Sequence, residues 1–474
     1  MKKGSSIIHK ESIVKEFFRD VSEAISGSEQ DYTEGKLGRA IILLSIPAVL
    51  EMIMESIFVI SDIWFVSKLG SDAVATVGLT ESVITIIYAI ALGLGTATTS
   101  MVSRRIGEKN NNEASVTAFQ SILLGLFISL IIGIPGAFFG ADLLRIMGAS
   151  GKIVSDYSGY TRIMLAGNGV IMMLFIINAI FRSAGDAAVA MKVLWLGNII
   201  NIILDPCFIF GLGPFPKLGV TGAAVATTCG RGAAVLVQFY LLFRGNKRIK
   251  LSFNQLMIDF KIMGKILRLS IGSIGQNIIG TTSWIALVRI ISMFGSEVVA
   301  GYTIGIRIIG FTLLPSWGLS NAASTLVGQN LGAKKPERAE KSVWVTGWVN
   351  MILLGFIGAI LVLFPEFFIR IFIKDENVIV SGVLCLRIVS LGYISYGLGM
   401  VLANSFNGAG DTSTPLKINI VAYYLVEIPL AWLLSIYAGM REEGVFISIV
   451  VAETLLTIIA WLVFRRGKWK LKEV

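Results

Sequence analysis

Ala184-Gly185-Asp186 is repeated 225 residues further along the chain as Ala409-Gly410-Asp411. The same offset aligns the chain with itself over some 175 residues without a gap. The matched pairs include Ser45-Ile46 with Ser270-Ile271, Gly70-Ser71 with Gly295-Ser296, Gly107 with Gly332, Lys109 with Lys334, and Gly219-Val220 with Gly444-Val445. Because one constant offset over this length is the signature of an internal repeat, we infer that the chain contains two copies of one structural unit.

The composition indicates that this unit lies in a membrane. Apolar residues make up 54% of the chain, charged residues only 15%, and the mean hydropathy is +0.76. Twelve apolar runs approach the roughly 20 residues that cross a bilayer. The predicted spans are 40–66, 74–100, 117–140, 158–182, 188–212 and 219–243, followed by 264–292, 298–325, 342–363, 382–406, 415–437 and 444–464. Six spans is an even number, so both copies enter from the same side; this predicts an all-α integral membrane protein with two parallel six-helix repeats in two lobes.

Charge sets the expected orientation. Seven basic residues precede the first span and five follow the last, whereas the six loops on the opposite side hold seven together. Since basic residues favour the cytoplasmic side, we expect both termini there, in a multi-pass protein of the plasma (inner) membrane. The expected parts are an N-terminal cytoplasmic segment at 1–39, the first lobe at 40–243, an inter-lobe loop at 244–263, the second lobe at 264–464 and a basic tail at 465–474.

The N-terminal segment and the net charge of +10 both suit a membrane surface. In the segment, apolar residues follow helical spacing and predict a short interfacial helix; they are Ile13, Val14, Phe17, Phe18, Val21 and Ile25. The basic residues then face anionic lipid, and nothing in the chain resembles a basic soluble domain with stacking aromatics, so we expect no nucleic-acid partner.

Enzyme motifs are missing from the sequence. The one histidine, His9, precedes the first span, so no Ser-His or Cys-His arrangement can form inside the membrane. No phosphate-binding GxxxxGK[ST] sequence occurs, and no pair of the three cysteines has metal-ligand or redox spacing. We therefore expect no enzyme activity and no cofactor, and gradient-driven transport is the class that remains.

Charged residues inside spans are costly and are functional candidates by default. The first copy holds Glu51, Glu55, Asp62, Glu81 and Asp205, and the second holds Glu427 and Glu453. At the positions equivalent to Asp62 and Asp205, the second copy has Leu287 and Leu430. This acidic pair therefore belongs to one lobe only.

Asp62 and Asp205 are both predicted to lie in the outer half of the first lobe. Asn201, one helical turn before Asp205, lies on the same helix face, and Pro206 frees the carbonyl of Ile202. Carboxylate, amide and carbonyl oxygens suit a small hard cation such as Na⁺, and two neighbouring carboxylates also suit a proton. The alternative is that both aspartates form structural ion pairs with Arg or Lys.

Four stretches together resemble the multidrug and toxic compound extrusion (MATE) transporters. They are Ser61-Asp62-Ile63-Trp64-Phe65-Val66-Ser67-Lys68-Leu69-Gly70, Phe181-Arg182-Ser183-Ala184-Gly185-Asp186, Asn201-Ile202-Ile203-Leu204-Asp205-Pro206 and Leu319-Ser320-Asn321-Ala322-Ala323-Ser324-Thr325-Leu326-Val327-Gly328-Gln329-Asn330-Leu331-Gly332. The resemblance covers about residues 36–465. It implies a V-shaped, two-lobe transporter that exports organic, often cationic compounds in exchange for Na⁺ or H⁺.

The branch that resembles the DNA-damage-inducible protein F type carries its cation site in the N-terminal lobe. This resemblance implies coupling roles for Asp62, Tyr160, Asn201 and Asp205. A further amide of that site falls on Phe175 here, with Asn178 one turn away, and Glu55 stands where the branch often has Gln. Another branch uses carboxylates on its seventh and tenth helices, where this chain has Gln276 and no acid, so that branch is disfavoured.

The substrate cavity is less sharply defined by the sequence. Aromatic, Met and polar residues in the spans could form an adaptable wall; we take Phe58, Met172, Met173, Phe175, Gln276, Trp284 and Arg307 as candidates. The expected function is a monomeric antiporter for amphipathic organic compounds. Two rivals remain: a flippase for lipid-linked saccharides or other anionic lipids, using a cationic cavity at Arg231 and Arg307, and a non-transporting receptor or scaffold. Interhelical pairing of both arginines with acids is the simpler expectation.

Overall fold

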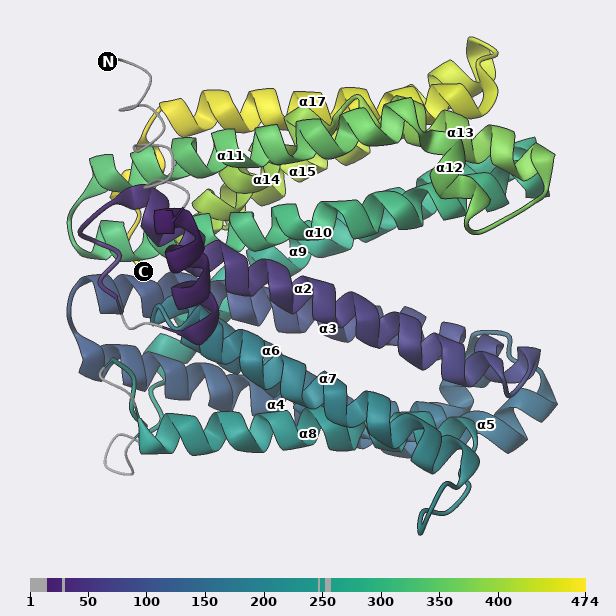
Figure 1. Cartoon of the computed structure of the whole chain (residues 1–474), viewed down its shortest axis with the longest axis horizontal. Coiled ribbons are helices and arrows are strands. Elements are labelled where there is room, and N and C mark those ends of the chain that lie inside the picture. Colours follow the sequence, from purple (N-terminus) through teal and green to yellow (C-terminus); the bar gives the residue numbers. More distant parts are fainter. Residues whose placement is uncertain (1–14, 28–29, 246–247, 252–256) are drawn as a thin grey trace.

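The computed structural model describes residues 15–27, 30–245, 248–251 and 257–474, and every regular element in these ranges is helical. The helices form two lobes that meet at one end of the molecule and diverge toward the other (Figure 1). The helix at residues 15–26 and the C-terminal turn at Lys468–Leu471 lie at the end where the lobes meet, which we name the terminal end. The opposite end is the distal end.

The first lobe contains α2 (Leu37–Ser67), α3 (Ser71–Gly107), α4 (Asn111–Ile146), α5 (Gly151–Ala166), α6 (Asn168–Ser183), α7 (Ala187–Phe210) and α8 (Val220–Arg244). The second contains α9 (Phe260–Ile291), η2 (Ser292–Phe294), α10 (Ser296–Gly332), α11 (Pro336–Leu363), α12 (Pro365–Arg370), α13 (Glu376–Ser390), α14 (Tyr393–Gly408), α15 (Ser413–Asn419), η3 (Ile420–Glu427), α16 (Ile428–Trp432), η4 (Leu433–Tyr437) and α17 (Arg441–Arg465), with η5 (Lys468–Leu471) after it. In the described ranges, eleven helical segments are long and apolar enough to cross a membrane, and the bent pair α13–α14 makes a twelfth when it is counted as one span. The predicted class, a multi-pass protein with twelve spans, is confirmed.

Two spans that the sequence presents as continuous are interrupted. Gly167 separates α5 from α6, and at the equivalent position Gly392 separates α13 from α14, which are bent by 57°. A Cβ at Gly167 would lie 3.0 Å from the carbonyl oxygen of Ile163 and from the side chain of Thr228. Residues Gly151–Ser183 still count as one membrane span, in agreement with the prediction at 158–182, whereas the bend within the span predicted at 382–406 is a change of direction that hydropathy does not record.

The eleventh span differs from its counterpart in the first lobe. α7 is a regular α-helix that continues through Pro206, whereas residues 413–437 alternate between α-helical and π-helical turns. The π-helical parts are η3 and η4. π-helical turns are rare and occur often at functional sites, so this span is a candidate for a role of its own.

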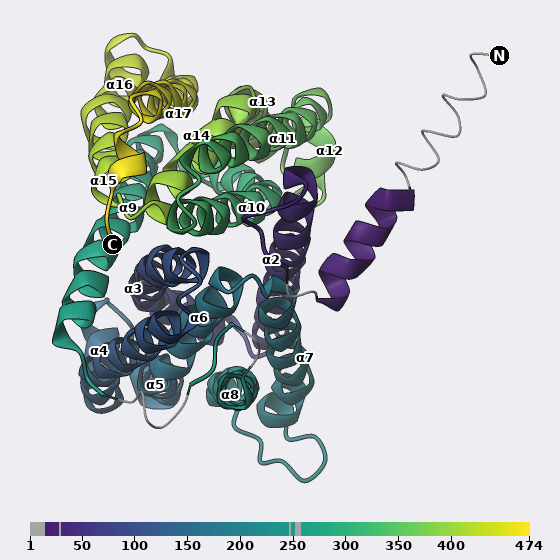
Figure 2. The ribbon, with the colours of Figure 1, turned by 90° about the vertical axis from the view of Figure 1, so that its left-hand side faces the viewer.

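The two lobes meet through α2 and α3 on one side and α9 and α10 on the other (Figure 2). At the terminal end the backbones of α3 and α10 nearly touch. A Cβ at Gly107 would lie 1.9 Å from the carbonyl oxygen of Gln329, and one at Gly332 would lie 2.1 Å from that of Arg104. Both contacts join residues related by the repeat, because Arg104 is equivalent to Gln329 and Gly107 to Gly332. We call this contact the vertex.

Equivalent helices of the two lobes end in turns of the same backbone conformation. Lys109 and Lys334 both adopt the left-handed conformation, with φ of 59° and 57°, after the ends of α3 and α10. Gly185 and Gly410 do the same after α6 and α14, with φ of 89° and 87°. Residues other than Gly rarely adopt this backbone, which accounts for glycine at 185 and 410, whereas the two lysines adopt it despite their side chains.

A segment at residues 30–36, named the strap here, joins the lobes at the terminal end. The Tyr32 hydroxyl donates to the carbonyl of Gly185 in the first lobe (3.0 Å). From the second lobe, Arg338 donates to the carbonyls of Tyr32, Glu34 and Gly35 (3.3, 2.8 and 3.0 Å). The preceding helix at residues 15–26 exposes Phe17, Phe18 and Ile25, in agreement with an interfacial face, while Ile13 and Val14 lie outside the described residues.

Candidate functional site

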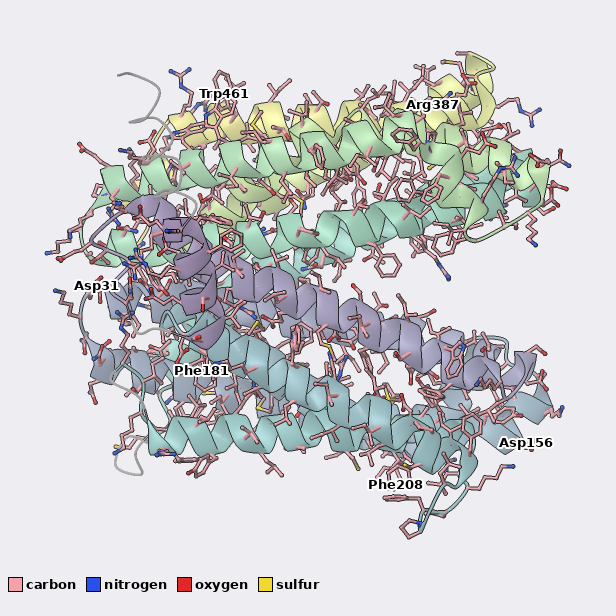
Figure 3. All side chains as sticks on the ribbon, viewed as in Figure 1. Asp31, Asp156, Phe181, Phe208, Arg387 and Trp461 are labelled. Atoms are coloured by element: carbon pink, nitrogen blue, oxygen red, sulfur yellow. The ribbon has the colours of Figure 1, made fainter. Side chains whose placement is uncertain are left out.

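The predicted aspartates lie in the distal half of the first lobe. α2 supplies Asp62 and α7 supplies Asp205; both are buried, and Asp62 lies within electrostatic range of Asp205, of Glu81 and of Arg231. Tyr160 of α5 is buried within range of both. Figure 3 places Phe208, three residues beyond Asp205, and Asp156, one turn before Tyr160, at the distal end. The structure thus brings together three of the predicted residues from three helices, which we call the acidic cluster.

The amide of Asn201 joins this cluster. Its Nδ2 donates to Oγ1 of Thr227 on α8 (3.1 Å) and makes a longer contact to Oδ1 of Asp205 (3.4 Å). Thr227 was not anticipated from the sequence, because hydroxyl residues are common in spans and this one gives no distinguishing signal. Among the described residues, Oδ1 of Asp62, Oδ2 of Asp205 and Oδ1 of Asn201 are buried and receive no hydrogen bond. Three acceptor oxygens without donors form an arrangement that a proton or a cation would satisfy.

Glu55 belongs to a second group, closer to the middle of the lobe. Its Oε1 accepts from Arg231 (2.5 Å) and its Oε2 from the amide of Asn198 (3.0 Å). Arg231 is 1% exposed; it also donates to the Tyr88 hydroxyl (2.8 Å) and stacks 4.7 Å from the ring centre of Phe58. The structure therefore places Glu55 in an ion pair rather than in the acidic cluster, and the predicted pairing of Arg231 with an acid is confirmed.

Asn178 belongs to a third group, nearer the terminal end, where Figure 3 shows the neighbouring Phe181. Arg182 donates to both carboxylate oxygens of Glu51 (2.9 and 3.0 Å), and Asn178 donates to one of them (2.9 Å). Gln238 completes the group by donating to Oδ1 of Asn178 (2.7 Å). The structure does not bring Asn178 to Asp62 and Asp205, because it points toward Glu51 instead.

The candidates for the substrate cavity do not form one wall. Met172 and Met173 are buried in the core of the first lobe, at 0% and 2% exposure, which leaves little surface for a ligand. Phe175 packs edge-on against Tyr88, with ring centres 5.6 Å apart. Trp284 is exposed, and so is Arg307, which has no ion pair with any described residue, so the expected pairing of Arg307 is wrong.

The second lobe buries two glutamates of its own. Glu427, the last residue of η3, accepts a short hydrogen bond from the Ser283 hydroxyl, and Glu453 of α17 accepts from the Tyr423 hydroxyl (2.7 Å). Gln276, a candidate from the sequence, exchanges two hydrogen bonds with Asn407 (3.1 Å each). No group of three or more His, Cys, Asp or Glu side chains suited to a metal ion occurs in the ranges that the structure describes.

Comparison with known proteins agrees with this architecture. The MatE family model matches residues 47–207 and again 273–433, once in each repeat. The chain belongs to the MatE family. It is therefore a membrane transporter and not an enzyme, as predicted.

Relatives of this MatE protein cover almost its whole length. A probable multidrug resistance protein NorM of Thermotoga maritima is 26% identical over 93% of this chain and 94% of its own. A FAD transporter of Shewanella oneidensis is 25% identical over 91% of this chain and 95% of its own. The solved outward-facing conformation of a multidrug resistance MATE transporter is 28% identical, covers 93% of this chain and 98% of its own, and superposes with a TM-score of 0.86.

The first lobe of this MatE transporter therefore carries three polar groups of different character along its interior. The Glu51 and Glu55 groups are each neutralised by an arginine. The acidic cluster has no ion pair with any described Lys or Arg. An internal carboxylate without a paired cation is costly in an apolar environment, and this distinguishes the cluster from the Glu51 and Glu55 groups.

Proposed function

We propose that this transporter is a secondary antiporter that exports amphipathic, often cationic organic compounds in exchange for H⁺ or Na⁺. The observation that supports the proposal is the set of buried oxygens of Asp62, Asp205 and Asn201 without hydrogen-bond donors among the described residues. A proton or Na⁺ that binds there removes the repulsion between the two carboxylates. Tyr160 and Thr227 line the same place and supply further oxygens.

Neutralising the two aspartates changes the repulsion between their helices, and this change can couple ion binding to a movement of the lobe. With both aspartates charged, α2 and α7 repel each other at the distal end; with a proton or cation bound, the two helices can approach. Because basic residues favour the cytoplasmic side, the proposal takes the terminal end as cytoplasmic, and the lobes of this structure then diverge toward the outside. The coupling ion then enters from outside and favours a rearrangement that returns the transporter to its inward-open state. The relatives named for multidrug resistance support organic compounds as the exported cargo.

The flippase alternative has less support. It needs a positively charged cavity at Arg231 and Arg307 to hold an anionic head group. Arg231 is buried and neutralised by Glu55, and Arg307 is exposed on the other lobe, so the two do not form one cationic site.

The test is dye efflux from proteoliposomes with proton and Na⁺ gradients imposed separately. Asp62→Asn and Asp205→Asn keep the size of each side chain but remove its charge, and each is expected to reduce gradient-driven efflux to the level of empty liposomes. Asp72→Asn is the matched control, because Asp72 is an exposed acid whose ion pair with Lys152 lies at the protein surface. Full efflux in either cluster variant contradicts the site assignment. The gradient that drives the wild type identifies the coupling ion.

A further inference from the structure

The second lobe contains a cavity that the proposed coupling site does not use. Its volume is about 390 Å³, and α9, α10, α14, α17 and the eleventh span all contribute to its wall. Leu92 and Thr96 of α3 also line it, so the cavity reaches the surface where the two lobes face each other. Pockets for small organic molecules typically measure about 300–1,000 Å³, whereas a bare ion needs only a close cage of oxygens. The size therefore favours an organic ligand.

The charged side chains that line the cavity indicate the charge of that ligand. Among the described residues that line it, Glu453 is the only carboxylate, and no Lys, Arg or His side chain is present. Glu453 is 4% exposed, and the hydroxyl of Tyr423 holds one of its oxygens at 2.7 Å. Because a buried carboxylate without a counter-ion is costly, the cavity is complementary to a positively charged molecule.

The remaining wall suits an aromatic or aliphatic cation. Trp317, Tyr396 and Tyr423 line the cavity and are of the aromatic type that attracts cations, and Met400 adds an adaptable apolar side chain. The hydroxyl of Ser273, which also lines the cavity, is buried and has no hydrogen-bond partner among the described residues. It is therefore available to a polar group of a ligand.

The distorted backbone of the eleventh span is part of this arrangement. Tyr423 lies within the π-helical segment η3, and its hydroxyl reaches Glu453 on α17. In the first lobe, the positions equivalent to Tyr423 and Glu453 are Asn198 on a regular α-helix and Thr228. The π-helical turn, the tyrosine and the buried carboxylate thus occur together in one lobe only.

We propose that this cavity binds the positively charged head of a monovalent organic cation, with Glu453 as its counter-ion and Tyr396 and Trp317 against its apolar part. The inference rests on the proposed export function and specifies where the cargo binds. It also assigns the two lobes different tasks: the first exchanges the coupling ion and the second holds the cargo.

The experiment measures binding of ethidium, a monovalent organic cation, to the purified transporter in detergent by fluorescence anisotropy. Glu453→Gln keeps the shape of the side chain and is expected to weaken ethidium binding at least tenfold, while a neutral aromatic compound of similar size binds the variant and the wild type equally. Glu427→Gln is the matched control, since Glu427 is also a buried glutamate of this lobe but does not line the cavity. Wild-type ethidium affinity in Glu453→Gln, or an equal loss in Glu427→Gln, overturns the proposal.

A second variant serves if Glu453→Gln does not fold. Ala403 lines the cavity, and Ala403→Phe fills it without altering any charge. This variant is expected to abolish binding of both ethidium and the neutral compound, and unchanged ethidium binding contradicts the proposal. For the wild type, tighter binding of anionic FAD than of ethidium also contradicts it. Binding in detergent requires no gradient, so Asp62→Asn should still bind ethidium. A failure of the coupling site in liposomes and a failure of the cargo site in detergent are therefore distinguishable.

Discussion

The two lobes have the same helix order but differ in the chemistry of equivalent positions. In the first lobe Glu51 and Arg182 form an ion pair, with nitrogen–oxygen distances of 2.9 and 3.0 Å. Their equivalents in the second lobe, Gln276 and Asn407, form two reciprocal amide hydrogen bonds of 3.1 Å. The same pair of helices is therefore joined at the same place by charges in one lobe and by neutral amides in the other. A duplicated scaffold can keep a contact while its charge changes.

The two lobes differ more in the buried carboxylates of their proposed binding sites. Asp62 and Asp205 have apolar equivalents, Leu287 and Leu430, while Glu453 has Thr228 as its equivalent. Each lobe thus buries carboxylates that the other lacks. The symmetric features are turns, helix order and the vertex, and the asymmetric ones are the candidate sites.

The largest effect on transport is expected at the vertex, where the two lobes are most alike. Gly107→Ala and Gly332→Ala each add a methyl group where a Cβ would lie 1.9 and 2.1 Å from a backbone oxygen. Since a backbone cannot yield as a side chain does, each variant must separate α3 from α10, and we expect transport to fall at least tenfold. Distances between spin labels on the two lobes should increase at the terminal end.

Two other glycines of the same helices serve as controls. Gly78 on α3 and Gly310 on α10 have open space around the position of a Cβ, so Gly78→Ala and Gly310→Ala should leave transport and label distances unchanged. Wild-type transport in both vertex variants would show that the close backbone contact is dispensable.

Replacing the ion pair of the first lobe by the amide pair of the second is expected to have an intermediate effect on stability. Glu51→Gln leaves Arg182 without its counter-ion, which costs about 3 kcal/mol of folding stability for a largely buried pair. The double variant Glu51→Gln/Arg182→Asn copies the amide pair of the second lobe and should recover most of this loss. The measurement is the melting temperature of the purified protein in detergent. A double variant no more stable than Glu51→Gln alone would show that the amide pair depends on its own lobe.

The smallest effect is expected at the strap. Arg338→Ala removes three hydrogen bonds to carbonyls of residues 32–35, and because the arginine is only half-buried at the end of the molecule we expect a loss of about 1 kcal/mol. Hydrogen exchange of the amides at residues 30–36 should accelerate. Arg370→Ala, which removes exposed ion pairs at the distal end of the second lobe, is the control and should leave this exchange unchanged.

The sequence predicts the fold well because its main signals are local. Apolar length identifies the spans, and the constant offset identifies the repeat. The breaks at Gly167 and Gly392 and the π-helical turns are missed because hydropathy does not record the path of a helix axis. These features depend on how neighbouring helices pack.

The candidate site is only partly predictable for a related reason. The cost of a buried charge marks Asp62 and Asp205, helical spacing adds Asn201, and the resemblance adds Tyr160. Spacing along one helix does not fix its rotation against its neighbours, so it could not show that Asn178 and Glu55 face other partners. Contacts between helices decide those assignments.

The vertex has the symmetry of a contact between two identical units. Gly107 against Gln329 and Gly332 against Arg104 are two images of one contact, related by exchange of the repeats. A self-complementary contact of this kind is what a symmetric dimer uses. A single six-helix repeat could therefore pair with a second copy of itself through the same surface. In the present chain each half carries buried carboxylates, such as Asp62 and Glu453, that the other half does not carry.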